Sequence, residues 1–157
     1  ELSGHQYIAK LGPDVVLEST TPEHLIAHMN QKRFQRKHLK TLLLDQGFFA
    51  GIGNYLRSEV LFAAQLHPDR TVSSLDDEDK LRLAEQALFL SQQSLKVPGI
   101  TIDLELYDQL RDIGLSRGQA RHWVFTRNDR ACHQCGDLII HSRPGGRRLD
   151  FCPRCQS

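Results

Sequence analysis

The sequence predicts a mainly α-helical protein that ends in a small β-hairpin. Apolar residues recur at three- and four-residue spacing in successive segments up to about residue 96, which is typical of helices with one buried face. This periodicity weakens after Pro98 and Gly99, and the chain beyond them holds all four cysteines, in two pairs. With 157 residues, of which 39% are hydrophobic and 25% charged, the chain can bury a core and is not disordered by composition.

We expect the chain to divide into three parts. Residues 1–20 have the mixed composition of a linker, residues 21–118 form the helical domain, and residues 119–157 form a four-cysteine unit. The first residue is Glu1 and not methionine, so we expect the chain to have been cut from a longer protein. No apolar run reaches the length of a membrane span and no basic-then-apolar leader opens the sequence, which favours a soluble, cytoplasmic protein.

The first predicted helix lies in the segment TTPEHLIAHMN. Thr21 can cap its free backbone amides, and Pro22 suits the first helical position. Its apolar face consists of Leu25, Ile26 and Met29.

Three further helices are predicted before Pro98. They lie in KHLKTLLLDQGFF, in NYLRSEVLFAAQL and in SLDDEDKLRLAEQALFLSQQSLK, and the acids from Asp76 to Asp79 crowd the positive end of the last helix dipole. The residues expected to face inward are Leu39, Leu42, Leu43 and Gln46, then Leu56, Val60, Leu61 and Ala64, and finally Leu81, Ala84, Leu88 and Phe89.

Shorter elements are expected after Gly99. The segment DLELYDQLRDIG predicts one or two helical turns, followed by a loop that Gly114 and Gly118 bracket. Short strands are expected at RHWVF and from Leu138 and Arg148 onward, around the cysteines.

The four cysteines predict a closed metal site. Cys132-x2-Cys135 and Cys152-x2-Cys155, with sixteen residues between the pairs, have the spacing of two zinc knuckles joined by a hairpin. Gly136 follows the first pair, where a tight turn lets backbone amides point at the thiolates. Four thiolates leave no open coordination position, so we predict one structural Zn²⁺ and no catalytic metal. Two disulfides or four free thiols are the alternative.

The stretch GIGNYLRSE places small residues at the start of a predicted helix. Gly51 and Gly53 can adopt positive φ and expose bare amides, and Asn54 occupies the position of a helix cap. Amides at a helix start carry partial positive charge, and the Asn54 NH2 can donate to a phosphate oxygen. We therefore predict a phosphate-binding turn, and a capped turn that binds nothing is the alternative. A dinucleotide site would need a preceding strand and a third glycine, where Leu56 stands.

The charges are distributed unevenly, although the net charge is only +1. Up to residue 112 the chain has 12 Lys and Arg against 16 Asp and Glu, whereas from Gly114 onward it has eight Arg, no Lys and three Asp. Guanidinium groups suit phosphate, so the C-terminal segment favours a polyanion partner, and a solvated basic face is the alternative. Arg147 and Arg148 lie just before Cys152, on a ribbon that can lie against a nucleic-acid groove.

The segment LLLDQGFFAGIGNYLRSEVLF, together with the terminal CHQCG and FCPRCQ, resembles the C-terminal half of the formamidopyrimidine-DNA glycosylase and endonuclease VIII family over nearly the whole chain. The family's helix-two-turn-helix motif corresponds to residues 37–66 and its zinc finger to residues 130–156. GNYLRSE is more similar to the endonuclease VIII branch, which removes oxidised pyrimidines. The resemblance implies a base-excision-repair DNA glycosylase with abasic-site lyase activity. Such an enzyme works in the bacterial cytoplasm at the nucleoid, as a monomer, on double-stranded DNA containing damaged bases or abasic sites.

The resemblance also implies which residues contact DNA. Asn54 matches the family's phosphate-binding asparagine, and Arg147 matches its zinc-finger arginine on the phosphates beside the flipped nucleotide. Gly51, Gly53 and Arg148 complete the expected contacts. In the family an amino-terminal proline attacks the sugar C1′ and a neighbouring glutamate handles protons. The start Glu-Leu does not match Pro-Glu, so we expect this chain to bind DNA weakly and to hold no catalytic residue.

Several other polar and aromatic residues are interpreted as structural. Asp45 and Glu59 flank the turn, but no nucleophile or water-activating metal accompanies them, so we expect them to hold the helices. Tyr55, Trp123 and Phe125 could stack on bases, but their spacing favours core packing. Two histidines near the cysteines are expected at the surface, His133 and His141.

Two other function classes stay open. One is a freestanding zinc-containing nucleic-acid-binding module without enzymatic activity, since helix-two-turn-helix units also occur in ribosomal proteins that grip RNA. The other is a zinc-stabilised protein-interaction domain. Salt dependence of binding separates the protein-interaction domain from both nucleic-acid binders, because only phosphate contacts release counterions.

Overall fold

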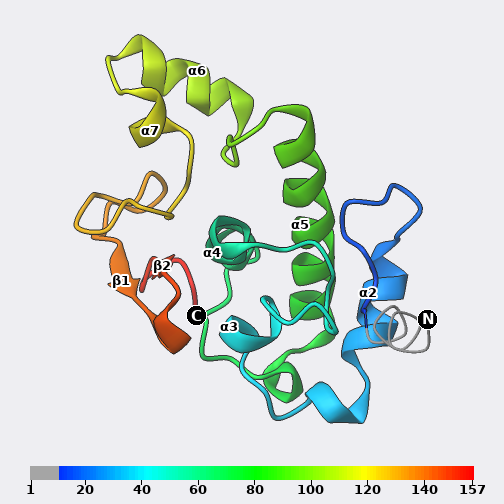
Figure 1. Cartoon of the computed structure of the whole chain (residues 1–157). Coiled ribbons are helices and arrows are strands. Elements are labelled where there is room, and N and C mark those ends of the chain that lie inside the picture. Colours follow the sequence, from blue (N-terminus) through cyan, green and yellow to red (C-terminus); the bar gives the residue numbers. More distant parts are fainter. Residues whose placement is uncertain (1–10) are drawn as a thin grey trace.

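The computed structural model describes residues 11–157, and its helices and hairpin confirm the predicted fold class. Six α-helices and two β-strands follow one another along the described chain (Figure 1). They are α2 (Pro22–Met29), α3 (Leu39–Leu42), α4 (Asn54–Ala63), α5 (Asp77–Lys96), α6 (Leu104–Asp112), α7 (Arg117–Ala120), β1 (Ile140–Ser142) and β2 (Leu149–Phe151), with 3-10 turns at Lys32–Phe34, Val72–Ser74 and Pro144–Gly146. Among residues 11–157, no helix combines the length and the apolar character that crossing a membrane would need.

The predicted linker lies only partly within the described residues, because residues 1–10 fall outside them. The rest of it packs on the helical body. The amide of Val15 donates to the carbonyl of Ala50 at 3.0 Å, and the Val15 side chain is fully buried. Residues 11–20 therefore extend the core beside the glycine turn.

Helix α2 begins as its sequence predicts. The Thr21 hydroxyl accepts a hydrogen bond from the amide of His24, and the His24 ring accepts one from the amide of Thr21, which makes a reciprocal cap. Leu25 and Met29 are fully buried, so the expected apolar face is confirmed.

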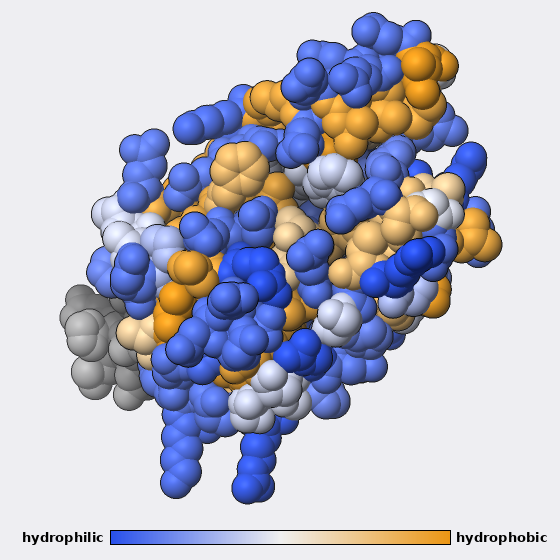
Figure 2. Space-filling model, turned by 180° about the vertical axis from the view of Figure 1, so that it is seen from behind, coloured by the Kyte–Doolittle hydropathy of each residue, from blue (hydrophilic) through white to orange (hydrophobic). Residues whose placement is uncertain are grey.

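The expected inward face of α5 is partly wrong. Ala84 and Leu88 are buried, but Leu81 and Phe89 are 43% and 56% exposed. The reason is that α5 lies between α2 and α4 (Figure 1), so the buried face is the one turned toward both helices. That face consists of Leu83, Ala84, Ala87, Leu88, Leu90 and Ser91. Figure 2 shows the molecule from behind, with apolar side chains still visible between the polar ones.

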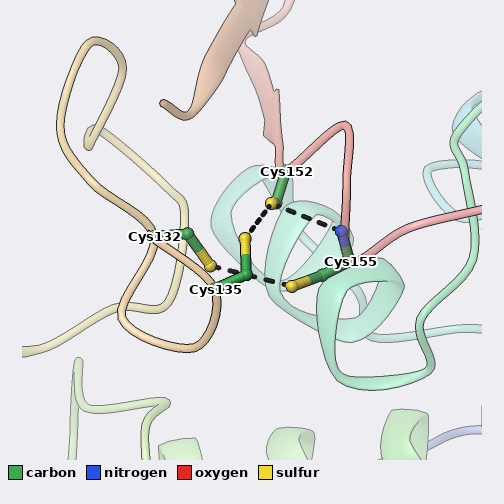
Figure 3. A group of neighbouring side chains, drawn as sticks. All are labelled: Cys132, Cys135, Cys152 and Cys155. Carbon is green, nitrogen blue, oxygen red and sulfur yellow. Dashed lines mark hydrogen bonds between the residues drawn. The ribbon is translucent and has the colours of Figure 1, made fainter. Parts of the chain in front are cut away.

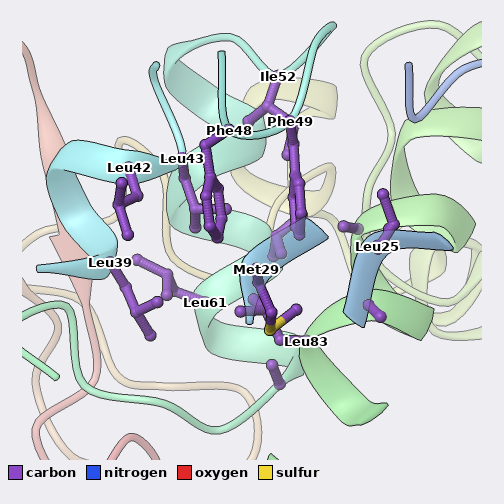
Figure 4. Packing of buried hydrophobic residues seen from close by; sticks show 14 of the residues in the cluster. Leu25, Met29, Leu39, Leu42, Leu43, Phe48, Phe49, Ile52, Leu61 and Leu83 are labelled. Carbon is purple, nitrogen blue, oxygen red and sulfur yellow. The ribbon is translucent and has the colours of Figure 1, made fainter. Parts of the chain in front are cut away.

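The main core gathers apolar side chains from four helices and the glycine turn. Figure 4 shows Leu25 and Met29 of α2, the leucines of α3, Leu61 of α4 and Leu83 of α5 meeting around Phe48 and Phe49. The two phenylalanine rings stack with centroids 4.2 Å apart. Helix α3 is shorter than predicted. Its continuation is a series of turns in which Gln46 is exposed, so the expectation that it faces inward is wrong. Its side-chain oxygen accepts a hydrogen bond from the amide of Gly51 at 2.8 Å.

Helix α4 is the central element of the fold. Figure 1 shows it nearly end-on between α5 and the β-hairpin, and every residue from Leu56 to Phe62 is buried. The expected inward residues Leu56, Val60, Leu61 and Ala64 are buried, as predicted. Three consecutive polar residues between them are buried as well, and these are Arg57, Ser58 and Glu59. Their contacts connect the helical body to the four-cysteine unit.

Candidate nucleic-acid interface and metal centre

The glycine turn differs in detail from its prediction. Gly51 has φ of +99°, the left-handed conformation expected, but Gly53 has φ of −98° and is extended. Gly53 is also the N-cap of α4, and Asn54 is the first helical residue, so the expectation that Asn54 caps the helix is wrong. Without a side chain at Gly53, the start of α4 is bare. A Cβ atom built there meets no heavy atom within 4 Å.

The Asn54 side chain is held by Arg57, one turn further along α4. An Nη2 hydrogen of Arg57 is directed at Asn54 Oδ1, at 3.4 Å. The guanidinium has only donors, so the oxygen of the amide must face it and the NH2 lies on the other arm. Among residues 11–157, no partner accepts a hydrogen bond from this NH2, which leaves both of its hydrogens free for a ligand.

The same guanidinium reaches the hairpin. Arg57 Nη2 donates to the carbonyl oxygens of Arg147 at 3.1 Å and Arg148 at 3.0 Å. The turn and the hairpin tip therefore lie together, joined through one residue, although Arg57 and Arg147 are 90 positions apart in the sequence. The structure thus brings the predicted residues Asn54 and Arg147 to one place.

The side chains of the two hairpin arginines are placed differently. Arg147 is exposed, and within the described chain its guanidinium has neither a hydrogen-bond partner nor a carboxylate. In contrast, Arg148 Nε donates to Asp150 Oδ2 at 2.7 Å, and its Nη2 donates to Asn128. Arg147 is free to bind an external anion, whereas Arg148 is largely occupied inside the protein.

The four cysteines converge on one point. Figure 3 shows that Cys132 and Cys135 come from the loop before β1, that Cys152 and Cys155 follow β2, and that the sulfur atoms point toward one another. All four Sγ atoms lie within 4.8 Å of one another. The sulfur atoms of Cys135 and Cys152 are 3.5 Å apart, and those of Cys132 and Cys155 are 3.9 Å apart. These separations are far longer than a disulfide bond of about 2.05 Å, so the disulfide alternative is wrong.

The residues fit a tetrahedral metal ion. Four sulfur atoms at about 2.3 Å from a central ion would lie about 3.8 Å from one another, close to the separations observed. Backbone amides support the thiolates, as predicted. Asp137 N donates to Cys135 Sγ and Cys155 N to Cys152 Sγ, both at 3.4 Å, and Gly136 turns the chain with φ of +85°. The site can therefore bind a metal ion with no position left open.

Glu59 ties α4 to the loop that precedes the cysteines. Its Oε2 accepts from the amides of Val124 at 2.8 Å and Phe125 at 3.0 Å, and its Oε1 accepts from the amide of Trp123 at 2.6 Å. The Thr101 hydroxyl donates to Oε1 as well. Burial raises the pKa of Glu59, and these hydrogen bonds oppose that rise. This fully buried carboxylate holds a loop and faces no open site, which is a structural role like the one expected.

The strand predicted at RHWVF is absent for the same reason. The amides of Trp123, Val124 and Phe125 bond Glu59 and have no strand beside them. Strands β1 and β2 are confirmed, and they pair antiparallel with Ile140 opposite Phe151. A side-chain carboxylate thus takes the place of a ladder partner.

Two further polar residues bind the finger to the helical body. The backbone amide of Asp150 donates to Ser58 Oγ at 3.2 Å. Gln156 is buried, and its side chain accepts from the amide of Cys152 at 2.8 Å and donates to the carbonyl of Leu66 at 3.0 Å. The finger is thus attached at its tip, its strand, its preceding loop and its last knuckle.

The aromatic and histidine candidates lie close to their expected places. Tyr55 packs against the main core, and Trp123 stacks on Phe62 with centroids 5.2 Å apart, which confirms packing roles. His141 is exposed, as expected, and its ring bonds Asp150 at 3.0 Å. His133 is half-buried, so its placement at the surface is wrong. It lies against Trp123 within the finger.

Sequence reasoning expected a structural role for Glu59 but missed Arg57 and Ser58, and it did not expect any of the three to be buried. The one available signal is that three polar residues stand consecutively between Leu56 and Val60, in a helix flanked by apolar residues. Such a stretch is ordinarily read as the solvated side of an amphipathic helix. Only the finger packing on that side makes these residues buried.

Fold and site together define a helix-two-turn-helix protein with a four-cysteine finger, and comparisons with known proteins agree with the helix-two-turn-helix part. The family model described as the formamidopyrimidine-DNA glycosylase H2TH domain matches residues 11–105. Endonuclease 8 of Pectobacterium atrosepticum is 36% identical over 157 residues, covering 99% of this chain and 56% of that protein. Formamidopyrimidine-DNA glycosylase of Heliobacterium modesticaldum is 39% identical over 127 residues, covering 78% of this chain and 43% of that protein.

Solved structures agree with the sequence comparisons. The MutM (Fpg) protein of Thermus thermophilus has a TM-score of 0.76 at 32% identity, covering 99% of this chain and 57% of that one. Lactococcus lactis Fpg in complex with abasic-site DNA has a TM-score of 0.74 at 24% identity, which supports the fold alone. The chain belongs to the formamidopyrimidine-DNA glycosylase H2TH family. It spans 56% of the length of the endonuclease 8 relative.

Proposed function

We propose that this chain is the damaged-DNA-binding half of a base-excision DNA glycosylase and abasic-site lyase that acts on oxidised bases, in particular pyrimidines. The observation that carries the proposal is the junction at Arg57, which places the free Asn54 NH2 and the free Arg147 guanidinium at one site. A helix start and a cation side by side are suited to a phosphate backbone. The relatives' printed names, endonuclease 8 and formamidopyrimidine-DNA glycosylase, support the repair role.

The proposed contacts follow from this geometry. Asn54 and Arg147 bind phosphates, and Gly51 and Gly53 let the strand approach the start of α4. Arg148 contributes less, because Asp150 and Asn128 already bind its guanidinium. The resemblance assigns catalysis to an amino-terminal proline and glutamate that the residues Glu1 and Leu2 do not match, so the proposal is that this chain leaves DNA uncut. We also propose that it binds double-stranded DNA as a monomer.

We propose Zn²⁺ as the ion held by Cys132, Cys135, Cys152 and Cys155, because four thiolates in a tetrahedron suit zinc. Such a closed site supplies folding energy and no Lewis-acid chemistry, since no coordination position is open. The nucleoid is the proposed place of action, consistent with the bacterial relatives.

Binding to a duplex with a stable abasic-site analogue tests the proposal. Neutralising about three phosphates predicts a slope near −2.7 for the logarithm of affinity against the logarithm of salt concentration. Arg147→Ala should weaken binding by about 1 to 3 kcal/mol. Fluorescence anisotropy at several salt concentrations measures both quantities. A salt-independent affinity, or tighter binding to single-stranded RNA than to the abasic-analogue duplex, would contradict the proposal. So would a covalent adduct trapped by borohydride on a duplex with a natural abasic site, whose sugar aldehyde can form a Schiff base with an amine.

A further inference from the structure

Arg57 is a buried cation with no carboxylate beside it among the described residues. Its side chain is fully engaged on one edge, where Nη1 donates to the carbonyl of Lys40 at 2.8 Å and Nη2 faces the oxygens of Asn54, Arg147 and Arg148. Only 2% of the residue is exposed. Buried charges are ordinarily paired with an opposite charge, so an arginine compensated only by neutral oxygens leaves a net positive charge at this site.

A second guanidinium increases that positive charge. Burial, and after it the charge of Arg147, lowers the pKa of Arg57 to about 10. The positive charge of Arg147 thus acts on Arg57, and among the described residues no carboxylate pairs with either arginine. An external anion between them would relieve this repulsion. The described residues fix the Arg57 guanidinium and the backbone of Arg147 and leave the exposed Arg147 side chain free to bind such a ligand.

The carbonyl contacts of Arg57 fix the hairpin tip. Arg57 Nη2 donates to the consecutive carbonyls of Arg147 and Arg148, which directly follow the Pro144–Gly146 turn. Gly145 and Gly146 in this turn have positive φ. Without these bonds, the backbone at Arg147 and Arg148 would lose its direct hydrogen bonds to α4, and the nearest remaining attachments would be Leu149 in the main core and the bond from Asp150 N to Ser58 Oγ. The position of the Arg147 side chain relative to Asn54 therefore depends on Arg57.

We propose that Arg57 is a positioning residue for phosphate binding, which orients the Asn54 amide and fixes the hairpin tip so that Asn54 and Arg147 bind the same strand as a coupled pair. The inference rests on the proposed DNA-binding function. It adds that the two contacts are cooperative, and that the cooperativity passes through one guanidinium spanning four oxygens.

A double-mutant cycle tests the coupling without altering Arg57. Asn54→Ala, Arg147→Ala and the double variant are compared by anisotropy on the abasic-analogue duplex. If each single change weakens binding about tenfold, the double variant should weaken it by clearly less than the hundredfold product, because losing one contact already frees the other. Strict additivity, with both single effects present, would overturn the inference. Absence of any binding by the unaltered chain would instead overturn the proposed function.

Substitution of Arg57 tests the positioning role directly. Arg57→Met should weaken binding about tenfold and reduce the further effect of Asn54→Ala to less than about twofold. Arg57→Lys should restore little, because a single ammonium cannot span the four oxygens that the planar fork reaches. Arg111→Met, an exposed arginine on α6, is the control for loss of one charge. An Arg57→Met affinity equal to that control would overturn the inference.

Two further measurements separate positioning from unfolding. Zinc content and circular dichroism report whether the Arg57→Met variant stays folded. The side-chain NH2 resonances of Asn54, read in the unaltered chain and in the Arg57→Lys variant by ¹⁵N–¹H spectra, report the amide itself. They should be two well-separated lines in the unaltered chain and should move toward free-amide values in the variant. Unchanged lines would overturn the inference, and if Arg57→Met unfolds, the cycle on Asn54 and Arg147 decides it.

Discussion

The proposed DNA-binding site has two parts, the glycine turn at the start of α4 and the four-cysteine finger. Different interactions stabilise these two parts. The glycine turn stands on a hydrophobic core, where Phe48, Phe49 and Ile52 pack against four helices. The finger packs in a small apolar cluster of five buried residues, of which two are cysteines and one, Phe62, belongs to α4. Beyond this cluster it has four cysteines that could hold a metal ion, and polar bonds to α4. The proposed site thus combines a part stabilised by apolar packing and a part with a candidate metal site. The contacts between the two parts are the specific hydrogen bonds of Arg57, Ser58 and Glu59, and we refer to these three residues as the polar joint.

The largest effect is expected from a substitution of Cys152, one of the four proposed metal ligands. The Cys152→Ser variant should unfold the finger, because a structural zinc contributes on the order of 10 kcal/mol to folding such a unit, whereas the helices should survive on their own core. Trp123, the single tryptophan, stacks on Phe62 at the finger, so its fluorescence reports the loss while far-ultraviolet circular dichroism reports the helices. Ser157→Ala, outside the cysteine set, is the control. A variant that keeps both the tryptophan signal and the helices without bound metal would contradict the metal assignment.

Glu59→Gln tests the joint between the halves. The amide that replaces the carboxylate presents an NH2 to backbone N–H groups of residues 123–125, so at least one buried donor loses its acceptor. We expect a loss of about 2 to 4 kcal/mol in the free energy of unfolding, with the pre-finger loop most affected. Urea titration measures it, and Glu85→Gln, an exposed glutamate on α5, should change little. Equal stabilities of the two variants would mean that Glu59 does not hold the loop.

His122, which lies beside Glu59, makes the free energy of unfolding depend on pH. His122 is 1% exposed, and burial, with the charge of Arg121, lowers its pKa from 6.5 to about 4. Between about pH 6.5 and pH 4, the His122 ring therefore binds a proton in the unfolded chain but stays neutral in the folded chain. Stability from the neutral ring is complete above pH 6.5 and is lost as pH falls toward 4, amounting to about 3 kcal/mol.

A comparison with His122→Phe isolates this dependence, because other groups titrate in both proteins. The unaltered chain should lose about 3 kcal/mol relative to the variant as the pH falls from 7 to 4, as measured by urea unfolding at each pH. Parallel curves for the two proteins would mean that His122 has the same pKa in the folded and the unfolded chain and would contradict the prediction. The ring lies 3.7 Å from Glu59 Oε1 and bonds Thr101, so the variant also tests how closely that cluster is coupled.

The sequence predicts the two halves better than it predicts the joint. Apolar periodicity finds α2, α4, α5 and α6, and cysteine spacing finds the metal site, because both signals lie within short segments. The polar joint depends on pairs such as Arg57 and Arg147, which are distant in the sequence and carry no local pattern. The same reasoning explains the wrong strand at RHWVF, whose β-branched and aromatic residues suit a strand until a distant carboxylate takes their amides.

The smallest effects are expected from alanine substitutions at Gly51 and Gly53. We expect Gly51 to be needed for the fold and Gly53 only for binding the ligand. At Gly51, φ of +99° and a Cβ contact of 3.2 Å to Asp14 make Gly51→Ala strained, with a loss of about 1 to 2 kcal/mol in stability. At Gly53 the conformation suits alanine and the space is open, so Gly53→Ala should leave stability unchanged or raise it by about 0.4 to 1 kcal/mol.

The same methyl group at Gly53 would stand where a phosphate approaches the start of α4. We therefore expect Gly53→Ala to weaken binding to the abasic-analogue duplex by about 1 kcal/mol, since the close contact of the strand with the bare amides is lost. Thermal unfolding and anisotropy on the same samples measure the two effects. If Gly53→Ala binds as tightly as the unaltered chain, the strand does not contact the helix start, and Arg147 would have to bind DNA without the turn.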